Sequence, residues 1–181
     1  MMKDSELMSD KDFKLMNYFF KIIDFLFPYV NKRAKTFGIK EGMTIIDYGC
    51  GPGRYTIPFA KLVGEKGKVV AVDIKDLALR EVEKKIKKYG INNIDIKLAK
   101  GNESGIESGI ADMVFAIDMF FKIKDHKSFL QELSRISKEN AVLVIDDGHQ
   151  SRKTTKEKIG NAGAWTIIEE KKDHLKCKKN I

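Results

Sequence analysis

A glycine-rich segment in the first third of the chain is the clearest candidate for chemistry. Residues 47–53 read Asp-Tyr-Gly-Cys-Gly-Pro-Gly and stand at the end of the short apolar run 43–47. Glycine lets the main chain turn sharply and leaves space for a ligand that a Cβ atom would exclude. A helix is expected to begin near Arg54, with its N-terminus facing the same space. The segment therefore predicts a ligand-binding loop between a strand and a helix.

An aspartate further along the chain narrows the type of ligand. Asp73 ends the apolar run 68–73, where its carboxylate is placed to accept hydrogen bonds from both hydroxyls of a ribose. A dinucleotide-binding loop has the pattern G-x-G-x-x-G, but Arg54 occupies the position of the third glycine. The acidic Asp47 ahead of the loop suits a ligand with a cationic end rather than a pyrophosphate. S-adenosylmethionine, with an ammonium group near a sulfonium, meets these conditions.

S-adenosylmethionine is a methyl donor, and a second set of residues is expected at the same edge of the sheet, where a methyl acceptor would bind. These residues follow the apolar runs 113–117 and 141–145 and are Asp118, His126, Asp146, Asp147 and His149. Asp118 is the better candidate for a residue that lies close to the acceptor. His149 is a candidate general base, with a surface or loop-capping role as the alternative, and Asp146 and Asp147 have a second interpretation as helix caps. Because methyl transfer mainly needs alignment of the reacting atoms, a catalytic group is required only where the acceptor must lose a proton.

The elements that hold these residues alternate between strands and helices. Apolar runs predict strands at 43–47, 68–73, 94–98, 113–117 and 141–145, then a closing hairpin of 165–169 and 174–177. Apolar periodicity predicts helices at 13–37, 55–63, 76–89, 126–137 and 153–159, with Pro28 kinking the first or dividing it into two. Alternation of this kind predicts an α/β fold with a largely parallel sheet and helices on both faces.

From about residue 40 onward, the chain resembles a known enzyme family. The matching segments are 44–56, 69–74, 111–115, 129–136 and 162–165. Together they resemble class I S-adenosylmethionine-dependent methyltransferases of the ubiquinone/menaquinone-biosynthesis type. The resemblance implies a Rossmann-like three-layer αβα sandwich, whose mostly parallel seven-stranded sheet includes an antiparallel C-terminal hairpin strand. It also implies S-adenosylhomocysteine as the product and no metal ion. A Rossmann-like domain for another nucleotide is the alternative.

The resemblance also assigns roles to single residues. Asp47 and the main chain of 49–53 would hold the methionine moiety, Asp73 the ribose, and Ile74 would lie against the adenine. Many relatives use the aspartate of a Gly-Asp-Ala segment for the adenine amino group, and here Asn102 aligns with it and can accept the same hydrogen bond. Cys50 would pack behind the cofactor, and Asp118 falls where relatives contact it through the main chain. The implied cofactor-binding set is Asp47, Gly49, Cys50, Gly51, Gly53, Asp73, Ile74, Asn102 and Asp118.

The acceptor is less defined than the methyl donor. The leading hypothesis is methylation of a small molecule by in-line displacement, on a quinone-like or other hydrophobic acceptor. The alternatives are methylation of RNA or protein by the same fold, and a cofactor-binding module without turnover. Residues 118–121 read Asp-Met-Phe-Phe instead of the asparagine-proline-proline-aromatic motif of amino-group methyltransferases. This difference argues against N-methylation of a base or of glutamine.

Composition and charge predict the kind of partner and the cellular compartment of the protein. The 181 residues carry a net charge of +8, mostly from lysine, and the basic C-terminal run is interpreted as a solvated edge rather than a nucleic-acid site. Cys50 and Cys177 are too few for a disulfide framework, which predicts a reducing, cytoplasmic location. No transmembrane segment is expected, because Lys21 and Asp24 interrupt the most apolar stretch, 15–30.

The predicted organisation is an N-terminal helical segment, residues 1–38, packed on an S-adenosylmethionine-binding domain, residues 39–181. The N-terminal segment is rich in aromatic residues. Its amphipathic helix is expected to pack on the sheet or on a partner subunit, which makes a homodimer contact a candidate. A lid over the cofactor and a membrane-surface helix are the alternatives, the latter disfavoured because the helix lacks a basic stripe.

Overall fold

The computed structural model describes residues 8–26 and 29–180. Within them, the N-terminal segment forms two helices, α1 (Asp10–Leu26) and α2 (Tyr29–Thr36), which is the divided form of the helix predicted over 13–37. The kink predicted at Pro28 falls outside the described residues. None of the described helices is long and apolar enough to cross a membrane.

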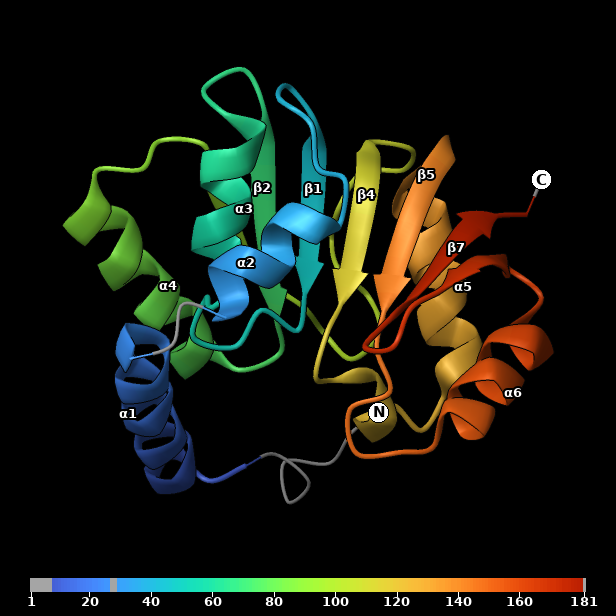
Figure 1. Ribbon diagram of the computed structural model, residues 1–181, viewed down its shortest axis with the longest axis horizontal. Coiled ribbons are helices and arrows are strands. Elements are labelled where there is room, and N and C mark those ends of the chain that lie inside the picture. The colour runs from blue at the N-terminus through green and yellow to red at the C-terminus, as the bar shows by residue number, and fades with distance from the viewer. Residues whose placement is uncertain (1–7, 27–28, 181) are drawn as a thin grey trace.

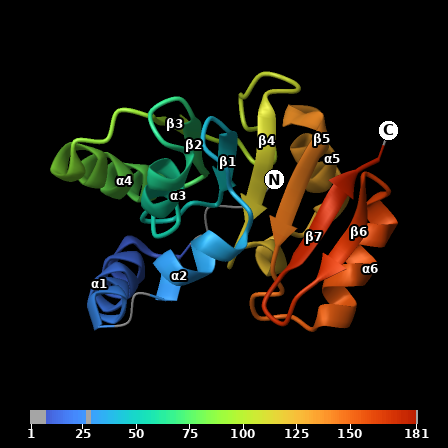
Figure 2. The ribbon, with the colours of Figure 1, turned by 45° about the horizontal axis from the view of Figure 1, so that its top comes forward.

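Seven strands form one sheet in the order β3-β2-β1-β4-β5-β7-β6. They are β1 (Thr44–Tyr48), β2 (Lys68–Asp73), β3 (Ile94–Leu98), β4 (Ala111–Ala116), β5 (Ser137–Ile145), β6 (Trp165–Glu170) and β7 (Leu175–Lys179). β1 pairs in parallel with β2 and β4, and β3 and β5 extend the parallel set on either side. β7 runs antiparallel to both β5 and β6, so a C-terminal hairpin completes the sheet, as predicted (Figure 2).

Helices cover both faces of this sheet. They are α3 (Thr56–Val63), α4 (Asp76–Tyr89), α5 (His126–Ile136) and α6 (Arg152–Ala162), with a short 3₁₀ turn at Phe120–Lys122. α2, α3 and α4 lie on one face, and α5 and α6 on the other (Figure 1). The predicted three-layer αβα sandwich is therefore confirmed.

Neighbouring residues of the central strands point into different cores. Ile45 belongs to the core that contains Phe59 of α3, whereas Ile46 belongs to the core that contains Leu133 of α5. All four side chains are fully buried. Burying a side chain of this size contributes about 1.5–3 kcal/mol, so both faces of the sheet stabilise the fold. This explains why the strands read as nearly continuous apolar runs.

Several element boundaries differ from the sequence expectation, and β5, α6 and β7 show the physical reasons. β5 begins at Ser137 rather than 141, because its first residue pairs with Ala111 directly after α5 ends. α6 is longer than 153–159, because the Ser151 side chain caps its N-terminus and Gly163 ends it in the left-handed region, at φ 69°. β7 runs from Leu175 to Lys179 instead of 174–177.

The carboxyl ends of β1, β2, β4 and β5 meet at one edge of the sheet, since these strands are parallel. Helix α1 lies at this edge, next to the loop after β2 and to α4 (Figure 1). Lys75 Nζ lies 2.6 Å from Asp10 Oδ1, and the Asn17 amide donates to Glu81 Oε2 at 2.8 Å. The edge is therefore bordered by the N-terminal helix as well as by the loops.

Candidate active site

The glycine loop between β1 and α3 has the geometry of a ligand cradle. Gly49, Gly51 and Gly53 all lie in the left-handed region, at φ 75°, 51° and 75°. A Cβ atom at Gly49 would lie 2.7 Å from Met119 Cγ, so Met119 excludes any side chain there. At Gly51 the direction of a side chain is open, with no atom within 4 Å of a Cβ position. This open approach to the main chain is what a bound cofactor requires.

Asp73 fixes the loop from the end of β2. Its Oδ2 accepts a hydrogen bond from the Gly51 main-chain nitrogen at 2.9 Å, and its Oδ1 accepts one from Lys75 at 2.8 Å. Burial raises the pKa of this carboxyl, although these main-chain N–H groups oppose the shift. Each oxygen keeps a further lone pair, so the carboxylate can still accept from the hydroxyls of a ribose.

Asp47 lies beneath the loop instead of in the open space above it. Its side chain is 4% exposed and accepts a hydrogen bond from the Thr56 hydroxyl at 2.6 Å. Burial raises the pKa of Asp47 to about 7, and the negative charge of Asp73 adds to this effect. Contact between Asp47 and the cationic end of a cofactor stays a prediction. Thr56 was not identified from the sequence as a partner of Asp47. The available signal was a hydroxyl side chain at the start of the helix that follows the loop.

The remaining cofactor candidates surround the same loop. Tyr48 Oη donates to the Asn102 carbonyl at 3.1 Å, which ties the segment after β3 to the end of β1. The Asn102 side-chain amide donates to the Asp125 carbonyl at 3.3 Å. Ile74 is half-buried against the core, and Cys50 is buried in the cluster under α4. Burial raises the pKa of the Cys50 thiol well above its usual value, which fits packing rather than nucleophilic chemistry.

A cavity of about 330 Å³ opens at the carboxyl ends of β4 and β5. Its lining comes from α2, the start of α3, the ends of the two strands and the turn between β6 and β7. The lining residues are Tyr29, Arg33, Arg54, Tyr55, Asp118, Asp146, Asp147, Gly148 and Asp173. Seen from β1, this cavity lies on the β4 side of the glycine loop, whereas Asp73 lies on the β2 side.

Arg33 connects the walls of this cavity. Its guanidinium donates to Asp173 Oδ2 at 2.7 Å, to Tyr55 Oη at 2.8 Å and to Asp146 Oδ2 at 3.3 Å. A fourth hydrogen bond reaches the Asp173 carbonyl at 2.8 Å. Burial lowers the pKa of the guanidinium, but Tyr55 and the two carboxylates more than offset this and raise it above its usual value. Sequence reasoning missed Arg33, the one arginine of the N-terminal segment.

Asp118 and Asp146 both line the cavity. Asp118 has φ 57°, unusual for a residue other than glycine, and its main-chain nitrogen donates to Asp146 Oδ1 at 2.9 Å. Burial raises the pKa of Asp146 to about 6; the negative charge of Asp118 adds to this shift, whereas the hydrogen bonds from Asp118 and Arg33 oppose it. Asp147 instead pairs with Arg152 at 2.8 Å. The helix-cap interpretation of both aspartates is wrong, because Ser151 caps α6.

Neither histidine candidate is part of the cavity lining. His149 is exposed and stacks edge-on against Phe121, with 4.8 Å between ring centroids. His126 begins α5, where its Nδ1 lies 3.3 Å from the Lys124 carbonyl. The general-base hypothesis for His149 therefore gains no support from the geometry. Across the described ranges, no group of three or more His, Cys, Asp or Glu residues is arranged to hold a metal ion.

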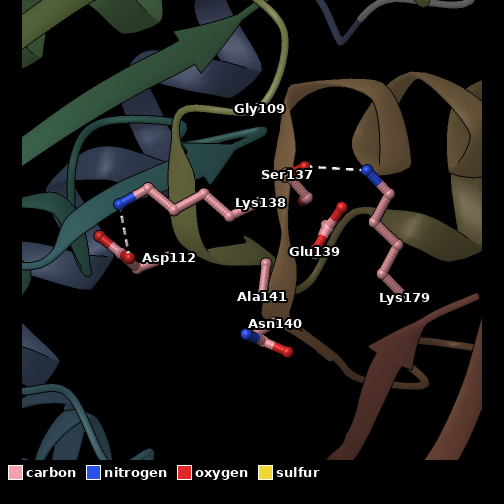
Figure 3. A pocket seen from close by; sticks show the side chains of 8 residues that line it. All are labelled: Gly109, Asp112, Ser137, Lys138, Glu139, Asn140, Ala141 and Lys179. Carbon is pink, nitrogen blue, oxygen red and sulfur yellow. Dashed lines mark hydrogen bonds and ion pairs between the residues drawn. The ribbon is translucent and has the colours of Figure 1, made fainter. Parts of the chain in front are cut away.

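A larger cavity, of about 480 Å³, lies at the opposite edge, where β4 and β5 begin. Its lining is Gly109, Asp112, Ser137, Lys138, Glu139, Asn140, Ala141 and Lys179 (Figure 3). Its lysines are paired: Lys138 Nζ lies 2.7 Å from Asp112 Oδ1, and Lys179 donates to the Ser137 carbonyl at 2.9 Å. Because ligands of open parallel sheets bind at the carboxyl ends of strands, the smaller cavity is the better candidate despite its size.

The sheet order, the glycine loop after β1 and the carboxylate after β2 define a Rossmann-like α/β protein. Residues 39–178 match the family described as methyltransferase domain. The chain belongs to this family.

Relatives and solved structures agree with this assignment. A demethylmenaquinone methyltransferase of Bacillus pumilus is 28% identical over 63% of this chain and 49% of its own length. A ribosomal protein L11 methyltransferase of Thermotoga petrophila is 24% identical over 75% of this chain and 48% of its own. The chain therefore spans about half the length of these curated relatives. A SAM-dependent methyltransferase of Aquifex aeolicus has the same fold, with a TM-score of 0.77, 27% identity, and coverage of 82% of this chain and 88% of its own.

Proposed function

We propose that the chain is an S-adenosylmethionine-dependent methyltransferase that transfers a methyl group to a small-molecule acceptor by in-line displacement. The observation that carries this proposal is the 330 Å³ cavity on the β4 side of the glycine loop. A site of this size suits a small molecule and lies at the lower end of the range for such sites. The family membership supports the reaction type.

The residues of the loop fit the cofactor. The open approach at Gly51 and the remaining lone pairs of Asp73 suit the nucleoside, and Asn102 lies on the neighbouring segment after β3. When bound, S-adenosylmethionine supplies a methyl group on a sulfonium, whose sulfur leaves as a neutral thioether. Asp118 follows β4 and lines the cavity, and β4 is the neighbour of β1, so Asp118 would border both ligands.

The N-terminal helices complete the acceptor site in this proposal. Tyr29 and Arg33 of α2 line the cavity, and Arg33 ties α2 to Asp146 and Asp173. Such a wall would align the acceptor with the methyl group and exclude water. The division into a helical segment, residues 1–38, and a methyltransferase domain, residues 39–181, is part of the proposal, as is the homodimer contact through the N-terminal helix.

A radiolabel experiment tests the acceptor class. The protein is incubated with S-adenosylmethionine labelled in its methyl group and with cell extract separated into small molecules, RNA and protein. The proposal expects label in the small-molecule fraction. Label in RNA or protein alone would support the macromolecular alternative, to which the name of the L11 methyltransferase relative points. Cofactor binding without label in any fraction would support a binding module without turnover.

A further inference from the structure

The charge of the cavity points to a particular acceptor. We propose that the methyl acceptor is a small alkyl amine, methylated on its nitrogen; this inference rests on the methyltransferase function proposed above. It replaces the hydrophobic, quinone-like acceptor expected from the sequence. The argument uses the cavity lining, the pairing of its charged groups and the charge that develops during methyl transfer.

Carboxylates outnumber cations in the lining. Four aspartates and two arginines contribute to it. Arg33 is shared by Asp146 and Asp173, at 3.3 and 2.7 Å, and Asp147 pairs with Arg152, which is not part of the lining. Within residues 8–26 and 29–180, the carboxylate of Asp118 has no hydrogen-bond or ion-pair partner, and it is exposed. The cavity therefore offers one unpaired negative charge to a ligand.

Arg54 is the second cation of the lining. Its guanidinium lies over the Phe20 ring of α1, 3.9 Å from the ring centroid, and this contact leaves its positive charge in place. With both arginines counted, the lining still holds more carboxylates than cations. The other lining groups are the rings of Tyr29 and Tyr55 and the main chain of Gly148. A ligand with a positively charged nitrogen and a short apolar part matches a lining of one unpaired carboxylate and two tyrosine rings.

The direction of charge movement distinguishes an amine from other acceptors. A neutral amine becomes positively charged as its nitrogen takes the methyl group, so a neighbouring carboxylate stabilises this transition state. The same carboxylate raises the pKa of the bound ammonium ion, so for an amine the two effects largely offset each other. A phenol, enol or thiol must first become an anion, and a neighbouring carboxylate raises the pKa of that group and disfavours the reactive form. The Asp118 carboxylate therefore favours an amine over an acceptor for C-, O- or S-methylation.

The reaction balances without a further reactant. The bound alkylammonium loses one proton to water, which frees the nitrogen lone pair. That lone pair forms the new nitrogen–carbon bond while the carbon–sulfur bond breaks, and the bonding electrons remain on sulfur in S-adenosylhomocysteine. The product leaves as an N-methylammonium ion. An alkyl amine differs from a base or glutamine amide, whose nitrogen lone pairs are delocalised, so the missing asparagine-proline-proline motif does not weigh against it.

Calorimetry with three ligands of equal size and different charge tests the proposal. Protein saturated with S-adenosylhomocysteine is titrated at neutral pH with benzylamine, benzyl alcohol and benzoate, which carry a positive, no and a negative charge. We expect the affinity to fall in that order. Asp118→Asn should weaken benzylamine binding roughly two- to fivefold, as expected for one exposed charge pair, and leave benzyl alcohol unchanged. Asp95→Asn, which removes an exposed carboxylate on β3, is the matched control and should change neither.

The outcomes separate this inference from the function on which it rests. If the protein does not bind S-adenosylhomocysteine, the methyltransferase proposal itself fails. If S-adenosylhomocysteine binds but benzylamine does not, or binds no better than benzoate, the amine proposal is overturned and the methyltransferase proposal stands. Equal loss of benzylamine affinity in Asp118→Asn and Asp95→Asn would also overturn it. A turnover assay adds an independent arm, in which label from the cofactor should enter benzylamine and not 4-methylphenol.

Discussion

Replacing Arg33 by methionine should destabilise the fold through the charge it leaves behind. Methionine keeps much of the apolar stem but removes the guanidinium and its four hydrogen bonds. Arg33 is 8% exposed and Asp146 is 5% exposed, so water only poorly replaces the lost partner of Asp146. Breaking a buried pair from one side costs about 3–5 kcal/mol. We expect the lower end, about 3 kcal/mol, because Asp173 remains partly solvated.

The loss should depend on pH in a defined direction. The folded pKa of Asp146, about 6, already lies above the unfolded value of about 3.9, so this group favours folding at low pH and its contribution falls as pH rises through 6. Without Arg33 the pKa of Asp146 should rise further, since the guanidinium stabilises the carboxylate. The difference in unfolding free energy between wild type and Arg33→Met should therefore be larger at pH 8 than at pH 5.

Urea and thermal denaturation followed by circular dichroism would measure this. For a chain of this length, about 3 kcal/mol corresponds to a fall of roughly 6–12 °C in Tm. Arg80→Met is the matched control: Arg80 makes an exposed i,i+4 pair with Asp76, and its loss should cost less than about 0.5 kcal/mol. Equal effects of the two substitutions, or a loss for Arg33→Met that is the same at pH 5 and pH 8, would refute the reasoning.

Three further outcomes are expected. Gly51→Val should abolish detectable binding of S-adenosylhomocysteine in calorimetry, because the residue has φ 51° and its side chain would enter the open approach to the loop. Unchanged affinity would contradict the assignment of this loop as the cofactor site. Gly148→Ala should lower Tm by several degrees, because φ is 54° and the Phe121 ring occupies the position of a Cβ atom; an unchanged Tm would contradict this packing. Cys50 and Cys177, both buried, should react with a thiol reagent only on unfolding, so rapid labelling of the native protein would be inconsistent with the structure.

The sequence predicted the sheet well, for physical reasons. β2, β3 and α4 have the predicted bounds. β2 ends at the charged Asp73 and α4 ends just ahead of Gly90, so the end of each apolar pattern is marked in the sequence. The start of β5 was missed because its first residues, Lys138–Asn140, are exposed and polar, so only pairing at Ser137 defines it. Apolar patterns mark what a strand buries, and they carry no signal where a strand extends into solvent.

The glycine loop and the acceptor cavity differed in how well the sequence predicted them. The glycine loop and Asp73 are local in sequence, so spacing alone placed them together. The acceptor cavity joins Arg33, Asp146 and Asp173 across more than a hundred residues, and no local pattern encodes such a contact. The aromatic N-terminal segment gave no sign that its α2 helix would deliver a buried arginine to the ends of β4 and β5.

The most direct test of the central claim is calorimetric titration of S-adenosylhomocysteine into the wild-type protein and into Asp73→Asn. The account predicts a dissociation constant of about 1–100 μM for the wild type, which corresponds to roughly −8 to −5.5 kcal/mol. Asp73→Asn should bind at least about tenfold more weakly, because an amide can accept at only one of its two positions. Absence of binding by the wild type, or equal affinity in both proteins, would contradict the assignment of this edge as the cofactor site.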